Sequence, residues 1–474
     1  MKAAALALAS TIALAGCAAR VPPPPASQLT LPATWRSPAS AAAAEGAALA
    51  PAPTVPAAWW EAYGDGALSA LVTRVLERNT DVRVTALRVA EFRARLAGAE
   101  ANRAPTVGAT LAPSRARVLA YNGVPYTTNL FSADFQAAYE VDLWGRLAHA
   151  SEAAAQALAA EQANAGAARL AVAALATTGY LQLRGLDAQL ELARATLDVR
   201  EQSRRLAQRQ FETGYTSRLE WLQAQAEYEA AAEQVPQLER QISEQENALS
   251  LLAGDVPGAV ARGRRLAELA PPEVPAGLPS ALLERRPDIA RAAHNLAAAR
   301  AGVQATSAQL LPSFRLTAGG GLQSTDFSKF LHDPTWLWRA GVGLAAPLWD
   351  GGRVQAQTDA AAAQRDQSML AYEHTVRSAL VEVENSLAAL QRLREQIRQN
   401  DARRATAAET LRIARNRYRN GYASYLEELD AQRTLYGADV ARLQLRTRLL
   451  AASVDLVRAL GGGWQADLSD LTGR

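Results

Sequence analysis

Two short stretches gather acidic and aromatic side chains just beyond a glycine. RYRNGYASYLEELDAQR, at residues 417–433, carries Tyr418 before the glycine and three carboxylates after it. These carboxylates belong to Glu427, Glu428 and Asp430. A second version, QFETGYTSRLEWLQAQA, occupies residues 210–226. Acidic residues gathered in this way can hold a cation, exchange protons in a reaction or line an ion path.

The same turn chemistry occurs in both stretches. Each has a glycine suited to ending one helix, then a serine three residues before a glutamate, Glu220 or Glu427, which is the capping-box spacing that begins another helix. The recurring turn residues are Gly214, Tyr215, Ser217, Gly421, Tyr422 and Ser424. Capping therefore accounts for part of the acidity. It does not account for Asp430, because the equivalent residue in the first stretch is the neutral Gln223.

Catalysis is a poor explanation for the remaining acids. The four histidines are far apart and lack metal-ligand spacing. They are His149, His294, His332 and His374. No Gly-rich phosphate loop ends in Gly-Lys-Ser/Thr, and 50 basic residues are nearly balanced by 47 acidic ones with no basic cluster. The sequence predicts no enzyme, cofactor, metal site or nucleic-acid partner.

The N-terminus predicts an exported lipoprotein. Residues 1–16 have a positive start and a short apolar run, as a signal peptide does. Cys17, the chain's single cysteine, stands where a bacterial lipoprotein signal resembling this one is cleaved and lipidated. The following Ala18, with no aspartate, favours the outer membrane of a Gram-negative cell. Residues 17–56, rich in proline and alanine, are expected to form a tether.

The rest of the chain is an internal duplication with an offset of 207 residues. Eight of the fifteen positions at 211–225 are identical to those at 418–432. The predicted organisation is repeat 1 at 57–260, a linker or equatorial segment at 261–280, and repeat 2 at 281–474. A common offset over separate segments indicates one duplicated unit.

Each repeat is expected to place two strands before a long helical hairpin. The predicted strands lie at about 106–117, 132–143, 313–322 and 337–348, and the predicted helical tips at about 212–217 and 419–424. From Ser132 to Leu143 apolar and polar residues alternate, which is typical of a strand between lipid and water. A soluble β-hairpin is the alternative.

Proline-free helical tracts follow the second strand of each repeat. They are expected at 146–211 and 353–419, each about 100 Å long at 1.5 Å per residue. Shorter tracts are expected at 66–104, 217–253, 281–311 and 424–460. Four strands are too few to close a barrel, and open edges in a bilayer are costly. The chain is therefore expected to oligomerise, with eight strands in a dimer or twelve in a trimer.

Several stretches together resemble the TolC-like outer-membrane efflux proteins, and most closely the OprM-like lipoprotein channels of RND-type multidrug pumps. They are WWEAYGDGALSALV at 59–72, LLERRPDIARAAHNLAAARAGVQATSAQLLPSF at 282–314, PLWDGGR at 347–353, RYRNGYASYLEELDAQRTLY at 417–436 and ALGGGW at 459–464. The resemblance implies a mainly α fold with a membrane β part: a homotrimer with a twelve-stranded barrel and a periplasmic α-helical barrel. The implied partners are outer-membrane lipid, a periplasmic adaptor and an inner-membrane RND-type transporter.

The resemblance also implies that the two tips close the tube and dock the adaptor. Tyr418 stands at the tyrosine of a TolC-type gate, and Glu220, Glu427 and Asp430 stand at its acidic positions. Ala423 replaces the arginine of that gate, so an arginine lock is not carried over. In a trimer, Glu427 and Asp430 would form stacked carboxylate rings that favour cations. Glu428, about 100° away, is expected to be solvated or to pair with an arginine.

The leading hypothesis is an exit duct for drugs or other small toxic compounds. A type I secretion outlet for polypeptides and a lipid-anchored coiled-coil scaffold without a pore are the alternatives. Met369 is the only methionine after the signal peptide, which disfavours a methionine-lined copper or silver path. The sequence leaves the exported substrate open.

Overall fold

The computed structural model describes residues 20–27, 29–36, 55–272 and 279–464. The predicted signal peptide and Cys17 lie outside these residues. The chain divides into two compact units. The first consists of Met1–Gln28, Arg88–Gln162 and Arg291–Glu373, and the second of Leu29–Leu87, Ala163–Ala290 and His374–Arg474.

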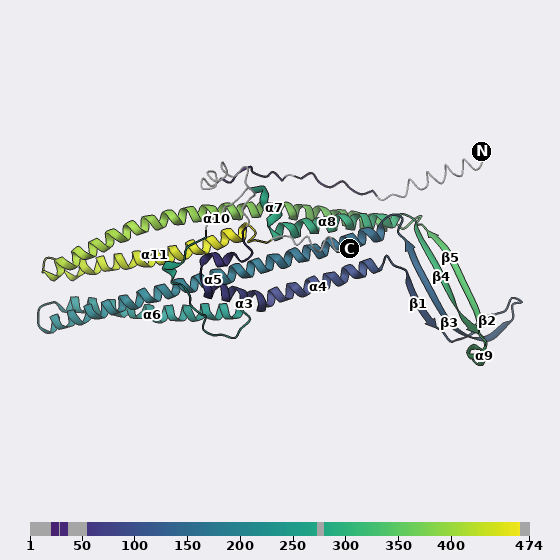
Figure 1. Ribbon diagram of the computed structural model, residues 1–474, viewed down its shortest axis with the longest axis horizontal. Coiled ribbons are helices and arrows are strands. Elements are labelled where there is room, and N and C mark those ends of the chain that lie inside the picture. The colour runs from purple at the N-terminus through teal and green to yellow at the C-terminus, as the bar shows by residue number, and fades with distance from the viewer. Residues whose placement is uncertain (1–19, 28, 37–54, 273–278, 465–474) are drawn as a thin grey trace. The chain divides into compact units, whose positions relative to one another are not determined.

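Two helical hairpins carry the tips (Figure 1). In each, a helix of 67 residues is followed after a short turn by one of 35 residues. They are α5 Arg146–Glu212 with α6 Arg218–Leu252, and α10 Arg353–Arg419 with α11 Tyr425–Ala459. Helix α6 continues through Pro236. The turns lie one residue or less from the predicted tips.

The shorter helical tracts are interrupted at equivalent points. They form α3 Gly66–Arg78, α4 Thr80–Ala101, α7 Leu282–Arg285 and α8 Pro287–Ser307. Asn79 breaks the first tract because its side chain accepts hydrogen bonds from the amides of Asp81 and Val82, at 2.9 and 3.2 Å. These bonds cap the start of a new helix. Arg286, 207 residues later, is extended because a proline follows it. The single helices predicted at 66–104 and 281–311 are therefore wrong in this detail.

The second unit has its core around α3, the middle of α5 and the adjoining ends of α6 and α11. Tyr180, Leu68 and Leu450 are fully buried there.

The short elements of the two units are η1 Trp59–Tyr63, η2 Leu266–Glu268, η3 Pro279–Ala281, η4 Ala308–Leu310 and α9 Phe327–His332.

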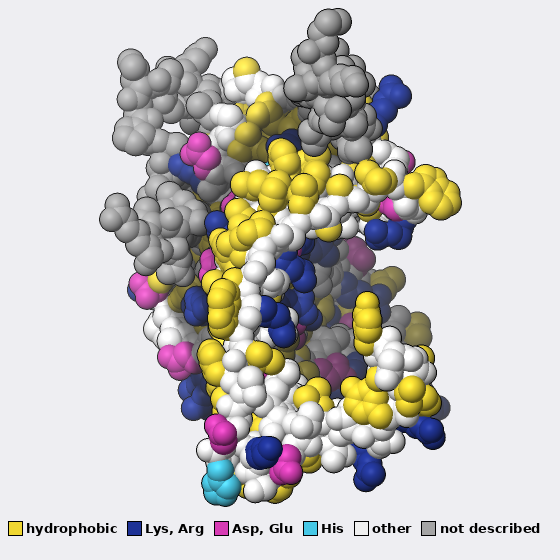
Figure 2. Space-filling view, turned by 90° about the vertical axis from the view of Figure 1, so that its right-hand side faces the viewer, with side chains coloured by type: hydrophobic (Ala, Val, Ile, Leu, Met, Phe, Trp, Pro, Cys, Tyr) yellow, Lys and Arg dark blue, Asp and Glu magenta, His cyan; other side chains and the backbone are white. Residues whose placement is uncertain are grey.

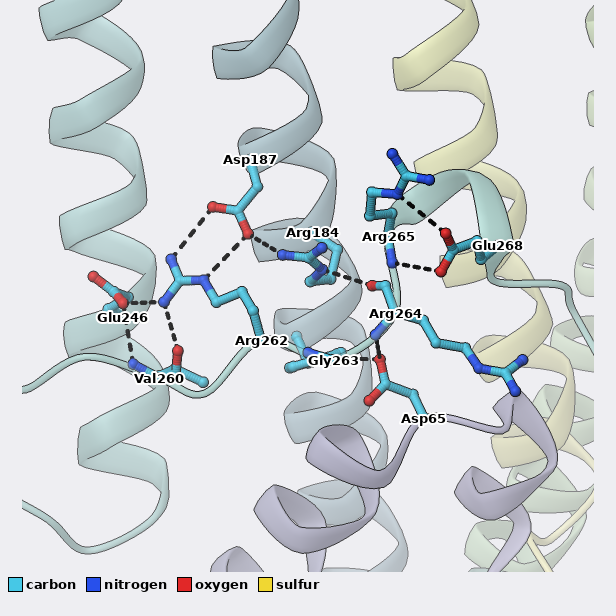
Figure 3. Close-up of polar contacts among 11 residues, drawn as sticks. Asp65, Arg184, Asp187, Glu246, Val260, Arg262, Gly263, Arg264, Arg265 and Glu268 are labelled. Atoms are coloured by element: carbon cyan, nitrogen blue, oxygen red, sulfur yellow. Dashed lines mark hydrogen bonds and ion pairs between the residues drawn. The ribbon is translucent and has the colours of Figure 1, made fainter.

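Polar contacts attach the connector between the repeats to this core (Figure 3). Asp65, 1% exposed, caps α3 and accepts hydrogen bonds from the Tyr180 hydroxyl and the Arg264 amide, each at 2.9 Å. Arg262 forms ion pairs with Asp187 on α5 and Glu246 on α6. The beginning of the predicted linker is thus fixed to the core by buried and half-buried charged side chains. Its proline and glycine content did not indicate these contacts.

The strands form one antiparallel sheet in the first unit. They are β1 Thr106–Leu111, β2 Ser114–Leu119, β3 Pro125–Val141, β4 Ser313–Ser324 and β5 Thr335–Ala345. The order is β1-β3-β4-β5, and β2 pairs with β3 in the same register as β1 does. The strand predicted at 106–117 is therefore interrupted, because Pro113 has no amide to donate to the ladder. The second strand begins at 125, not 132.

The two faces of the sheet differ in polarity. The strand register places a row of apolar side chains on one face of the sheet, and this row runs along most of the length of the sheet. These are Val107, Leu111, Phe131, Phe135, Tyr139, Phe314, Leu316, Trp336, Trp338, Val342 and Leu344. Trp338 and Val342 are each 76% exposed. The opposite side carries Asp134, Arg315 and Arg339. Figure 2 shows hydrophobic side chains gathered along the strands on the side facing the viewer.

No helix in the described ranges is long and apolar enough to cross a bilayer.

The N-terminal segment at residues 20–27 lies against α10. The amide of Arg20 donates to Gln355 at 3.1 Å, and the hydroxyl of Ser27 donates to Glu373 at 2.8 Å. The predicted tether is therefore fastened by hydrogen bonds over part of its length.

Candidate functional site

The two tips have the same backbone geometry. Gly214 and Gly421 adopt left-handed conformations, with φ of 74° and 75°. In each tip, the residue after the glycine donates its amide to a carbonyl five residues back, and the glycine donates to one three residues back. The four pairs are Tyr215–Gln210, Gly214–Phe211, Tyr422–Arg417 and Gly421–Tyr418, at 2.8–3.0 Å. This is the Schellman ending expected at such glycines.

The serine caps differ between the tips. The Ser217 side chain accepts the amide of Glu220 at 3.4 Å. Ser424 makes no side-chain cap, and its carbonyl accepts the amide of Glu427 instead, at 3.2 Å. The capping-box prediction therefore holds for the serine of the first tip and is wrong for that of the second.

An apolar cluster joins the two hairpins near their tips. Ala207, Ala224, Tyr425 and Leu429 are buried together, and Tyr418 packs against them. The rings of Tyr418 and Tyr425 are 5.6 Å apart. All four long helices contribute, so the two tips pack as one body.

A chain of polar contacts also crosses these helices next to the cluster. Arg200 on α5, 5% exposed, lies 3.3 Å from the carboxylate of Glu227 on α6 and hydrogen-bonds to Gln432 on α11. Glu227 also accepts from Arg433 at 2.9 Å. We call these four residues the latch: Arg200, Glu227, Gln432 and Arg433.

Glu428 extends the latch to α10. It is 7% exposed, accepts from Gln432 at 2.8 Å and pairs with Arg415 at 3.1 Å. Of the two expectations for this residue, pairing with an arginine is correct and solvation is wrong. The Arg415 side chain is 39% exposed, so this ion pair is buried only on the side of Glu428.

The remaining predicted gate residues have two environments. Tyr418 is half-buried, and its hydroxyl lies 3.5 Å from the Gln210 side chain. Burial, assisted by the negative charge of nearby Glu220, raises the pKa of Tyr418 to about 12. One oxygen of Glu220 is buried without a hydrogen-bond partner among the described residues. Glu220 and Tyr418 are thus brought together, one from each tip.

Glu427 and Asp430 are exposed on one face of α11. Glu427 lies 3.8 Å from Arg417, and both side chains are about half exposed. Asp430 makes no hydrogen bond or ion pair within the described residues. Neither belongs to the buried network, and both carboxylates are exposed to solvent.

Apolar side chains at equivalent positions are exposed on both tips. Tyr215 and Tyr422 are 77% and 78% exposed, and Leu219 and Leu426 are 64% and 55% exposed. Such paired exposure of large apolar groups on a helical end is typical of a protein-binding surface.

The latch was not predicted from the sequence. Arg200 and Glu227 lie outside the quoted motifs, and their further partners, Gln432 and Arg433, come from the other repeat. The spacing of Glu428 and Gln432, four residues apart on α11, was the available signal. Within the described ranges, no group of histidine, cysteine or acidic residues could hold a metal.

Comparison with known proteins decides the family. The model of the outer membrane efflux protein family matches residues 71–255 and 278–462, which cover both repeats. The chain belongs to the outer membrane efflux protein family. It is 33% identical over 475 residues to the pyoverdine export outer membrane protein OpmQ of Pseudomonas aeruginosa, covering 98% of both chains.

Two further members extend this likeness. The chain is 36% identical to the toluene efflux pump outer membrane protein TtgC of Pseudomonas putida, covering 86% of this chain and 85% of TtgC. The crystal structure of CusC, a protein that forms a transmembrane channel, has a TM-score of 0.83 at 29% identity, covering 93% of this chain and 99% of CusC. The predicted TolC-like fold, the outer-membrane location and the periplasmic helices are confirmed. The family consists of channel proteins and is not an enzyme family.

Proposed function

We propose that the chain is the exit duct of a tripartite efflux pump that exports drugs or other small toxic compounds. The observation that carries this is the exposed apolar face of a sheet with two unpaired edges, joined to long helices. The sheet order leaves β5 at one edge and β1 with β2 at the other. Unpaired backbone groups in a bilayer cost several kcal/mol each, so the edges must pair between chains.

Three copies satisfy this requirement best. With β1 and β2 counted as one interrupted strand, each chain supplies four positions, and a trimer closes twelve. Long helices continue from the sheet, and a dimer with eight strands would leave an interior filled by side chains. A twelve-stranded trimer leaves a lumen for solutes.

The tips would close this duct in its resting state. The apolar cluster and the latch hold the hairpin of α10 and α11 against that of α5 and α6, and exposed Glu427 and Asp430 would face the narrowest point. Opening then requires separation of the hairpins, and the contacts of the latch contribute to the free energy that this separation needs. The position of Ala423, where a TolC-type gate has arginine, is consistent with a lock supplied by Arg200 and Arg433.

The exposed tip residues would dock the periplasmic adaptor, with an RND-type transporter behind it. Tyr215 and Tyr422 give the same chemistry twice per chain, and therefore six times in a trimer. Replacing both with serine should abolish co-purification of the adaptor without changing trimer assembly. Unchanged co-purification would place the docking surface elsewhere. Membrane anchoring would come from lipidation of Cys17.

Deletion and complementation test the substrate class. A deletion strain should become several-fold more susceptible to small toxic compounds, and the wild-type chain should restore resistance. Loss of a secreted polypeptide with unchanged susceptibility would instead favour the type I secretion outlet.

A further inference from the structure

The apolar face of the sheet ends in a polar patch. Arg115 and Arg117 on β2 pair by register with Asn129 and Thr127 on β3. By strand alternation, all four share the face of Phe131 and Phe135. All four are exposed. We call these four residues the arginine patch.

Topology places the arginine patch on the external side of the membrane. β3 and β5 lead into α5 and α10 at one end of the sheet, and β1 and β4 follow α4 and α8 at the same end. Those helices extend into the periplasm in this family. The hairpin of β2 and β3, with its turn at residues 120–124, lies at the opposite end.

The length of the apolar face sets the level of the patch. From Val141 to Phe131 β3 advances ten residues, or about 33 Å along the strand and about 25 Å in height at a typical tilt of 40°. That height equals the apolar band of an outer-membrane barrel. Asn129 and Thr127 lie two and four residues further, about 5–10 Å beyond the band, at the depth of lipid headgroups.

Aromatic side chains mark the same boundary independently. The Phe131 ring lies 5.3 Å from that of Phe327 and 6.3 Å from that of Phe330, both on α9. Aromatic rings concentrate where a membrane protein passes from hydrocarbon to headgroups. The arginine patch begins immediately beyond this cluster.

The charge of the patch is not neutralised by its own hairpin. Residues 114–131 contain two arginines and no acidic residue. Neither arginine has an ion pair among the described residues. On the opposite face, by contrast, Arg315 and Arg339 share the sheet with Asp134 and Glu140. Two guanidinium groups beside a hydroxyl and an amide suit a phosphate group, which arginine binds through two parallel hydrogen bonds.

We propose that the arginine patch binds a phosphate-bearing headgroup of a lipid in the external leaflet. The site follows from the outer-membrane location and the register of the sheet. It does not depend on which solute the duct exports. Its occupancy would fix the depth and orientation of each β2–β3 hairpin in the bilayer.

The test compares two lipids on the purified, assembled full-length protein. Lipid A with both phosphates should bind and raise the temperature of oligomer dissociation, and the same lipid stripped of its phosphates should have little effect. In the double variant Arg115→Gln/Arg117→Gln, affinity for the phosphorylated lipid should fall at least about tenfold, or about 1.4 kcal/mol. Arg339→Gln, which removes one charge from the opposite face, is the control and should bind as the wild type does.

Three outcomes would overturn the proposal. They are equal binding of both lipids by the wild type, undiminished binding by the double variant, and an equal shift with inorganic phosphate alone, which would indicate a free-anion site. If the glutamine variant fails to assemble, the two-lipid comparison on the wild type still decides. Arg115→Lys/Arg117→Lys keeps the charge and should retain part of the affinity.

Discussion

At the residue scale, adjacent acids of one motif have different environments. Glu428 is buried and paired with Arg415, whereas Asp430 is exposed and lacks a partner among the described residues. The difference arises because two positions on a helix are about 200° apart. The sequence could indicate that Glu427 and Asp430 share a face. It could not indicate that Glu428 is buried against Arg415 on α10, because that requires knowing how the helices pack together.

Asp430→Ala should raise single-channel conductance and weaken cation preference, because it removes one carboxylate per chain from the proposed constriction. Ion selectivity in planar bilayers measures this. Gln223→Ala, the equivalent position in the first repeat, is the control and should leave selectivity unchanged. Unchanged selectivity of the Asp430 variant would rule out the acidic constriction.

Tyr418 should make the tips sensitive to alkali. Its pKa is raised to about 12, mainly by burial and then by the charge of Glu220, whereas tyrosine in an unfolded chain titrates near pH 10. The protonated phenol therefore stabilises the fold fully below about pH 10, and this contribution is lost as the pH rises towards 12. Tyr418→Phe should reduce the loss of stability between these values, measured by thermal unfolding. The exposed Tyr215→Phe should behave as the wild type does, and an identical pH profile for Tyr418→Phe would contradict the assignment.

At the element scale, the duplication predicts two equivalent tips, and the structure gives equivalent turns with unequal caps. The glycine turns and the hairpin lengths could be read from the sequence, because backbone geometry at a glycine is a local property. The latch and the fastened N-terminal segment could not, because both depend on pairing between distant segments. The break of the first strand was readable at Pro113, which has no amide to donate to the ladder.

Ser217→Ala should destabilise the first turn of α6 by about 1 kcal/mol, because it removes a side-chain cap. Ser424→Ala should cost little, since no side-chain cap exists there. Hydrogen exchange of the amides at each helix start separates the two cases. Equal protection losses would show that both serines act as caps.

Arg200→Met should weaken the contact between hairpins by about 2 kcal/mol, because it removes the charged hydrogen bond from Arg200 on α5 to Gln432 on α11. The expected result is a higher open probability in planar bilayers and greater entry of large antibiotics into cells. Arg194→Met, six residues earlier on α5, is the control. Its pair with Glu239 is about half exposed and worth at most about 1 kcal/mol. An equal open probability in both variants would contradict a role of the latch in gating.

At the scale of the whole molecule, the sheet requires both lipid and further copies of the chain. The exposed apolar face needs lipid, and the unpaired edges need other copies of the chain, so the isolated chain is incomplete. The periodicity of the strands and the offset of 207 residues already predicted this from the sequence. A long helical hairpin alone would equally fit a scaffold without a pore, and only the sheet distinguishes the two.

Conductance of the purified full-length protein in planar bilayers shows whether the chain forms a channel. We expect discrete, cation-preferring channels from an assembled oligomer, with a larger conductance after Asp430→Ala and more frequent opening after Arg200→Met. Protein that assembles and inserts, yet conducts no ions in the wild type or either variant, would contradict this expectation.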